Sequence, residues 1–288
     1  MSSVEYTRAV PPANGSKPME PRPVPVTSDM LPPAITSVRN LRFAAFLALR
    51  TREERASRGV FLLEGAKLTE EALTSGRAQC VLVDAERIES FGRLIELALS
   101  RNVEIAPLAG SLVAKLSQTP SPQGVLVVAS LPDAPAPCQL GARIVALDGV
   151  QDPGNVGTII RTADAAGLTG ALLTPACADP YSIKSIRATM GSIFRVPIRV
   201  DSRAADIIKD IKAAGARVLV SSARGVPYYN ISIREPWILI IGSEGCGVSD
   251  ELRDIATDTI ALPMRGGAES LNAAVAAGVL MYALTQSE

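Results

Sequence analysis

The chain has 288 residues, of which 47% are hydrophobic and 4% aromatic, so one or two domains with a large aliphatic core are expected. Its 29 Lys and Arg balance its 29 Asp and Glu, so the overall charge does not indicate a nucleic-acid partner. The chain contains no histidine, which excludes Ser-His-Asp and Cys-His catalysis, HExxH zinc sites and a histidine general base. The four cysteines are far apart, so we expect neither a disulfide framework nor a metal site.

Residues 1–33 hold eight of the 21 prolines and little apolar periodicity, which predicts a disordered leader. The leader lacks the charged-then-apolar order of a secretory signal, although a role as another kind of targeting segment stays open. No apolar run reaches the ~18 residues that cross a membrane. We therefore expect a cytoplasmic protein without a membrane partner.

Residues 34–131 alternate helical and strand patterns and predict a small α/β domain. Residues 40–59 are predicted to form one helix, with Leu41, Ala44, Ala45 and Leu49 facing inward and the arginines outward. Apolar runs predict strands and amphipathic runs predict helices in the rest of this part. The strands are expected at 59–65, 80–84, 103–108 and 124–130, and the helices at 67–73 and 91–99.

Residues 132–142 contain three prolines and predict a semi-rigid linker. The alternation restarts in residues 143–288, where continuous apolar strands between helices indicate a mostly parallel sheet covered on both faces. The strands are expected at 143–148, 170–174, 216–222, 237–242 and 258–263, and the helices at 156–166, 182–193, 205–215 and from 272 onward.

Three glycine-containing stretches follow predicted strands. In "LDGVQDPGNVGTIIRTADAAG", Asn155 is suited to cap the next helix, Gly167 to end it, and Arg161 lies opposite the apolar face. "WILIIGSEGCGVSDEL" places glycines just after a strand, where backbone can approach a ligand closely. "IALPMRGGAESLNAAVAAGVLMYAL" leads through Ser270 and Asn272 into an apolar helix, for which these two residues could simply be caps. Neither phosphate-loop motif is present, which disfavours a nucleotide-binding enzyme.

Taken in order, N-x-G-x-x-x-R, I-G-S-E-G and L-P-M-x-G-x-x-x-S-L-N closely resemble the three motifs of the SpoU/TrmH family of RNA ribose 2′-O-methyltransferases. The segment "SIRATMGSIFRVPI" resembles the one that this family places between its first two motifs. The N-terminal stretches "ITSVRN", "RASRGVFLLEG" and "SPQGVLVV" resemble its substrate-binding domain. The departures are mild, such as Leu262 where isoleucine is common.

This resemblance implies a homodimer of the SPOUT class, with a trefoil knot in the C-terminal domain, an RNA substrate and S-adenosylmethionine as cofactor. By motif match, backbone contacts to the cofactor come from Gly242, Leu262 and Leu271. The expected catalytic pocket consists of five side chains. These are Asn155, Arg161, Glu244, Ser270 and Asn272.

A separate N-terminal domain favours ribosomal RNA as the substrate. A transfer RNA 2′-O-methyltransferase and a catalytically inactive RNA-binding protein of the same fold remain alternatives. Whether the role is housekeeping or antibiotic resistance stays open. Two basic stretches, residues 39–58 and 181–203, each carry a net charge of +4 and are expected to bind phosphates in a salt-dependent way.

Overall fold

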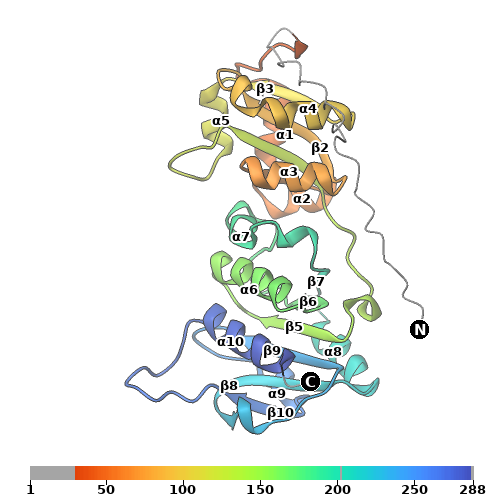
Figure 1. Ribbon diagram of the computed structural model, residues 1–288, viewed down its shortest axis with the longest axis vertical. Helices are drawn as coiled ribbons and strands as arrows, with labels where there is room; N and C mark the ends of the chain where they lie inside the picture. The colour runs from red at the N-terminus through yellow and green to blue at the C-terminus, as the bar shows by residue number, and fades with distance from the viewer. Residues whose placement is uncertain (1–29, 202, 287–288) are drawn as a thin grey trace, which may run out of the picture.

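The computed structural model describes residues 30–201 and 203–286, which fold around two β-sheets stacked along the long axis of the molecule (Figure 1). Most of the predicted leader, residues 1–33, lies outside the described residues. Within the described ranges, no helix is long and apolar enough to cross a bilayer, and no cluster of side chains has the composition of a metal site.

The first sheet has the order β1-β4-β2-β3, formed by β1 (Val60–Glu64), β2 (Ala78–Asp84), β3 (Glu104–Leu108) and β4 (Val125–Ser130). Strand β4 is antiparallel to β1 and β2, whereas β2 and β3 are parallel. Helices α3 (Ala66–Thr74) and α4 (Gly92–Ser100) pack on one face. Helices α1 (Leu41–Ala48) and α5 (Gly110–Leu116) pack on the other.

The single helix predicted for residues 40–59 is wrong, because the chain forms two helices there, α1 and α2 (Arg52–Arg58), with Thr51 capping the second. The predicted inward face is wrong at Leu41 and Ala44 and right at Leu49. Leu41 is 87% exposed, while Phe43, Phe46 and Leu49 are buried. Alanine and leucine are so frequent in this segment that two faces of the helix are apolar. The face with the phenylalanines packs on the sheet, because their larger side chains bury more apolar area.

The second sheet has the order β10-β8-β9-β5-β6-β7, and all of its pairs are parallel. Its strands have the following bounds: β5 (Arg143–Asp148), β6 (Gly170–Leu173), β7 (Ile198–Val200), β8 (Arg217–Pro227), β9 (Trp237–Gly242) and β10 (Asp258–Ala261). The predicted parallel sheet is confirmed, and the three-residue β7 was not predicted.

Helices cover both faces of this second sheet, as the continuous apolar runs predict. Alternate residues of each strand point to opposite faces, so Val145 and Leu147 pack under one layer, and Ile144 and Ala146 under the other. Helices α6 (Pro153–Ala165) and α10 (Ala273–Thr285) form the first layer. Helices α8 (Ala204–Ala213) and α9 (Asp250–Asp254) form the second.

Helix α6 begins three residues earlier than predicted, and its cap is Asp152 rather than Asn155. The Asp152 carboxylate accepts the backbone N–H of Asn155 at 2.9 Å, and Pro153 occupies the first helical position. Gly167 follows the last turn at φ +73°, as predicted. Because Asp152 satisfies the helix end, the Asn155 side chain is available for other contacts.

Helix α7 (Ile183–Thr189), capped by Ser182, is shorter than the predicted helix 182–193, because Met190 and Gly191 adopt left-handed φ values. A short 3-10 turn, η4 (Ser192–Phe194), follows. Gly157 of α6 lies against α7 so closely that a Cβ atom there would be 2.2 Å from the Ser185 carbonyl oxygen. This glycine therefore sets the spacing between the two helices.

We predict that Gly157→Ala lowers the free energy of unfolding by about 1–3 kcal/mol, because the added methyl forces α6 and α7 apart. Urea denaturation measures the change. Gly92→Ala is the matched control, since a Cβ at Gly92 meets nothing within 4 Å. Equal stability of both variants would contradict the close contact.

Candidate functional site

Three loops meet at one edge of the second sheet, because parallel strands end on the same side. They follow β5, β9 and β10. The loops after β9 and β10 contain the second and third sequence motifs, and the loop after β5 leads into α6, which contains the first. The loop after β9 folds back on itself, with mutual backbone hydrogen bonds between Ser243 and Gly247 at 3.0 and 3.1 Å. It is tied to the end of β5, where the Asp148 carboxylate accepts the backbone N–H of Ser249 at 2.7 Å.

The motif glycine Gly242 has a steric role in this loop. A Cβ at this position would lie 2.1 Å from the carbonyl carbon of Gly247, so only glycine allows the two backbone segments to pass. Gly242 and Gly247 also line the space between the loops after β9 and β10. Such a glycine-lined surface can contact a ligand without intervening side chains.

The Asn155 side chain joins all three loops. Its Nδ2 donates to Oε1 of Glu244 in the loop after β9, and its Oδ1 accepts from Nδ2 of Asn272 at 3.0 Å. Asn272 also caps α10, since its Oδ1 accepts the backbone N–H groups of Ala274 and Val275. The capping function expected for Asn272 is therefore present together with a contact to the first motif.

A cavity of about 510 Å³ opens between the middle of β8 and the loops after β9 and β10. This volume lies within the range of small-molecule sites. Six of the eight residues predicted for the site line it. They are Gly242, Glu244, Leu262, Ser270, Leu271 and Asn272.

Arg161 does not line the cavity. It lies on the exposed side of α6, about 9 Å along the helix axis from Asn155, and its side chain forms no hydrogen bond or ion pair with any residue in the described ranges. Its guanidinium is therefore available for an external group. Its i−4 neighbour is Gly157, so the arginine lies near the side of α6 that faces α7.

The cavity also contains functional groups that the motifs did not indicate. Arg253 reaches its wall from α9, where it donates to the Val248 carbonyl at 2.6 Å and pairs with Asp250. Cys246 and Glu269 also line it. Glu269 occupies an unspecified position within the third motif, but Arg253 follows no strand and belongs to no motif, so no local pattern could identify it.

Asp152 maintains the first turn of α6 over a wide pH range. The hydrogen bond from the Asn155 backbone and the neighbouring Lys184 ammonium hold the pKa of this carboxyl below its usual value of 3.8. A carboxyl whose pKa is lower in the folded state stabilises the fold at pH values above its unfolded-state pKa. This stabilisation is lost as pH falls through the folded-state pKa. The helix end that presents Asn155 is therefore fully capped at neutral pH.

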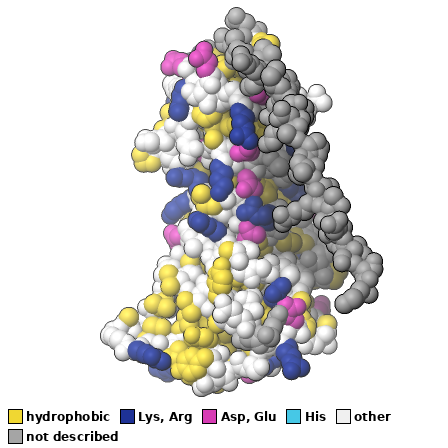
Figure 2. Space-filling view, in the orientation of Figure 1, with side chains coloured by type: hydrophobic (Ala, Val, Ile, Leu, Met, Phe, Trp, Pro, Cys, Tyr) yellow, Lys and Arg dark blue, Asp and Glu magenta, His cyan; other side chains and the backbone are white. Residues whose placement is uncertain are grey.

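Most of the cations in the two basic stretches are bound within the protein. Arg42, Arg55 and Arg58 pair with acidic residues, as do Lys184, Arg195, Arg199 and Arg203. Arg39, Arg52 and Arg187 are exposed and pair with no acidic residue in the part of the chain that the structure describes. Lys and Arg side chains still gather in a band between the two sheets in Figure 2. The net charge of each stretch therefore overstates the number of free cations.

Known proteins resemble both parts of the chain. Residues 142–282 match the SpoU rRNA Methylase family, and residues 40–127 match the MRM3-like substrate binding domain. The 23S rRNA (guanosine(2553)-2′-O)-methyltransferase RlmP of Bacillus subtilis is 36% identical over 253 residues, which cover 87% of this chain and 98% of that protein.

Two solved structures agree with this fold. The SpoU methyltransferase AviRb from Streptomyces viridochromogenes, in complex with the cofactor AdoMet, has a TM-score of 0.77 and 30% identity, covering 86% of this chain and 98% of that chain. The AdoMet-bound rRNA methyltransferase from Sinorhizobium meliloti has a TM-score of 0.77 and 32% identity, covering 88% and 97%.

We predict that Asn272→Ala lowers the free energy of unfolding by about 1 kcal/mol, because it removes the cap of α10. Asn272→Asp should lose less stability than Asn272→Ala, because aspartate keeps the cap of α10 and loses only the hydrogen bond from Nδ2 to Asn155. Urea denaturation of the two variants tests this difference. If both lost the same stability, the cap would not be the stabilising contact.

Proposed function

This chain belongs to the SpoU rRNA methylase family, and we propose that it transfers a methyl group from S-adenosylmethionine to a ribose 2′-hydroxyl of ribosomal RNA. The observation that carries the proposal is the convergence of Asn155, Glu244 and Asn272 beside a ligand-sized cavity. The identity to a 23S rRNA 2′-O-methyltransferase over almost the whole length of both chains supports the substrate class.

The volume and the charge of the cavity fit S-adenosylmethionine. Gly242 and Gly247 in its lining let a ligand approach the backbone closely. The charged residues of the lining are Glu244, Glu269 and Arg253. Two carboxylates and one guanidinium complement a ligand with a sulfonium, an ammonium and a carboxylate. We assign the backbone contacts to Gly242, Leu262 and Leu271.

The cofactor supplies an activated methyl group, so the residues of this chain chiefly align the ribose and assist loss of its proton. Ser270 and Asn272, at the mouth of α10, are assigned to position the 2′-hydroxyl. Glu244 accepts a hydrogen bond from Asn155 and so holds the Asn155 amide in one orientation. Since Asn155 in turn accepts from Asn272, these side chains form one pre-organised unit.

Arg161 is assigned to the RNA phosphate beside the target ribose. A guanidinium stays protonated in proteins and binds phosphate through two parallel hydrogen bonds. Its exposure and its lack of an internal acidic partner within the described ranges suit such a role. A positive charge at this place also favours the alkoxide that develops on the ribose.

We assign a homodimer to this enzyme, with its interface on α10. The outward side of that helix exposes Val275, Val279 and Tyr282, which are 42–52% accessible. Tyr229, which is 57% exposed, lies beside them. Hydrophobic side chains gather on the C-terminal half of the face shown in Figure 2. A contiguous apolar surface of this kind is typical of a subunit interface.

Three further assignments complete the proposal. Residues 34–131 bind the RNA and residues 143–288 carry out the transfer. The C-terminal segment forms the trefoil knot that is expected of a SPOUT enzyme. We also assign the protein to the cytoplasm.

Transfer of radiolabelled methyl from S-adenosylmethionine to purified RNA tests the proposal. We expect one alkali-resistant linkage in ribosomal RNA, because a 2′-O-methyl group blocks hydrolysis of the adjacent phosphodiester. Labelling of transfer RNA alone would contradict the substrate. Cofactor binding by calorimetry without transfer to any RNA would contradict the enzymatic role.

We predict that Arg161→Lys lowers turnover by about 10–100-fold, since lysine keeps the charge but loses one charge-assisted hydrogen bond worth ~1.5–3 kcal/mol. Single-turnover methylation assays measure the loss. Arg234→Lys is the control, because Arg234 is exposed before β9, at the opposite end of the sheet from the site. Full turnover of Arg161→Lys would exclude two-point phosphate binding.

A further inference from the structure

The two parts of the chain are joined by more than the connecting residues 131–142. Side chains of α7, which belongs to the C-terminal part by sequence, complete the core of the N-terminal part. Ile183 packs into the cluster of α1 and α5, and Ile186 into the cluster of α3 and α4. Phe61 of β1 also contacts Tyr181 and Phe194, with ring centroids 5.4 and 6.2 Å apart.

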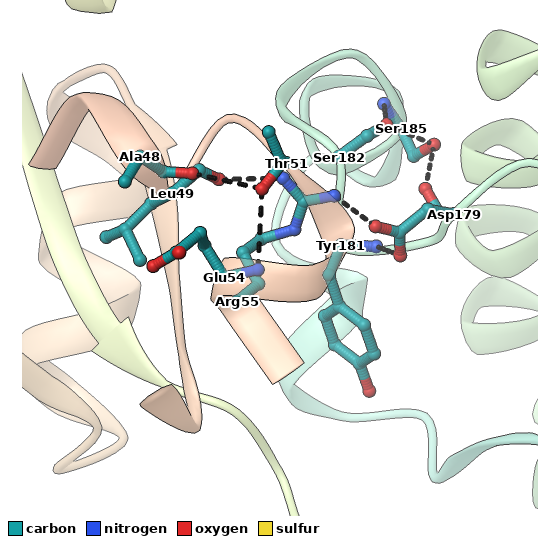
Figure 3. Close-up of polar contacts among 9 residues, drawn as sticks. All are labelled: Ala48, Leu49, Thr51, Glu54, Arg55, Asp179, Tyr181, Ser182 and Ser185. Carbon is teal, nitrogen blue, oxygen red and sulfur yellow. Dashed lines mark hydrogen bonds and ion pairs between the residues drawn. The ribbon is translucent and has the colours of Figure 1, made fainter. Parts of the chain in front are cut away.

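A buried ion pair closes one side of this contact. The Arg55 guanidinium, on α2, donates to the Leu49 carbonyl at 2.7 Å and to the Asp179 carboxylate, which precedes α7 (Figure 3). The two side chains are only 6% and 15% exposed. A buried guanidinium is costly without its partner, so this contact strongly favours one arrangement of the two parts.

A second ionic contact lies at the other end of the α7 segment. Arg195, just after η4, pairs through Nη1 with Glu71 of α3 and through Nε with Asp164 of α6, each at 2.8 Å. One arginine therefore bridges the N-terminal part to the helix that carries Arg161. Asp164 is also held by the Ser192 hydroxyl at 2.7 Å.

Both contacts lead directly to α6. The Asp179 carboxylate accepts the Tyr181 backbone N–H, and its backbone carbonyl accepts the Ser185 hydroxyl at 2.7 Å (Figure 3). Ser185 is the residue whose carbonyl lies against Gly157. Gly157 is two residues from Asn155 and four from Arg161. A continuous chain of packed and hydrogen-bonded residues thus connects α2 with the candidate site, so the position of one depends on the position of the other.

We propose that Arg55 and Arg195 are positioning residues that lock the N-terminal part onto α7 and thereby fix the distance between the bound RNA and the methyl-transfer site. This inference rests on the proposed function. A flexibly tethered domain would capture RNA equally well, but it would present the ribose over a range of positions. A locked joint presents one ribose, and alignment errors near 1 Å can cost ~100-fold in rate.

Arg55→Gln tests the proposal, with Arg93→Gln as the control. Arg93 forms an exposed ion pair with Glu70 inside the N-terminal part, so its loss does not affect the joint. For Arg55→Gln we expect kcat on ribosomal RNA to fall about tenfold, while KM for RNA stays within about twofold. The calorimetric affinity for S-adenosylmethionine should not change, because the cavity has no residue from the joint.

Glu71→Gln is the second variant, because it breaks the Arg195 contact at the partly exposed edge of the joint and leaves the Asp164 pair intact. If Arg55→Gln does not fold, this variant alone tests whether the joint affects kcat. Unchanged kcat in a folded variant would overturn the proposal, as would a loss confined to KM. A matching loss of cofactor affinity would also overturn it, because that would show general damage.

Hydrogen exchange distinguishes failure of the joint from failure of the proposed function. Amide exchange in α7 should accelerate in Arg55→Gln and Glu71→Gln but not in Arg93→Gln, whatever RNA the protein methylates. Unchanged exchange in all three variants would overturn the proposal that these contacts lock the N-terminal part onto α7. If the unmodified protein transfers no methyl to RNA while exchange responds as expected, only the function is wrong.

Discussion

The hydrogen bonds of a single amide hold the candidate site together. Asn155 donates to Glu244, 89 residues away, and accepts from Asn272, 117 residues away. The amide can do this because Asp152 caps α6 in its place and Asn272 caps α10 with its other atom. Each helix end is thus satisfied without using the bonds that join the loops. The site depends on this division of polar contacts.

The same helix, α6, is where the remaining parts of the protein meet. Its buried face packs on the parallel sheet, Gly157 contacts α7, and Asp164 is held by Arg195. The N-terminal part docks on α7 and Arg195, so the proposed RNA-binding part and the proposed ribose site share one support. A rigid support suits a reaction in which the cofactor is already activated and the main requirement is alignment.

The strands of the second sheet were predictable because buried parallel strands are continuous apolar runs, and only the three-residue β7 was missed. The apolar face of α1 was assigned wrongly, since alanine and leucine fill both sides. The cap of α6 was misplaced because Asp152 and Asn155 offer the same chemistry three residues apart. The motifs identified six residues of the cavity, whereas Arg253 and the Arg55–Asp179 pair depend on long-range contacts that no local pattern encodes.

The central claim, that the cavity beside Asn155 receives the methyl donor, is tested most directly by alkylation of Cys246, which lines that cavity and is exposed. Cys138 is also exposed and serves as the internal control, while burial raises the pKa of Cys80 to about 12 and that of Cys177 above its usual value. In mass-spectrometric footprinting with iodoacetamide, saturating S-adenosylmethionine should slow labelling of Cys246 at least tenfold and leave Cys138 unchanged, since a bound ligand covers the thiol. Equal labelling of Cys246 with and without a cofactor that calorimetry shows to be bound would place the methyl donor elsewhere and contradict the account.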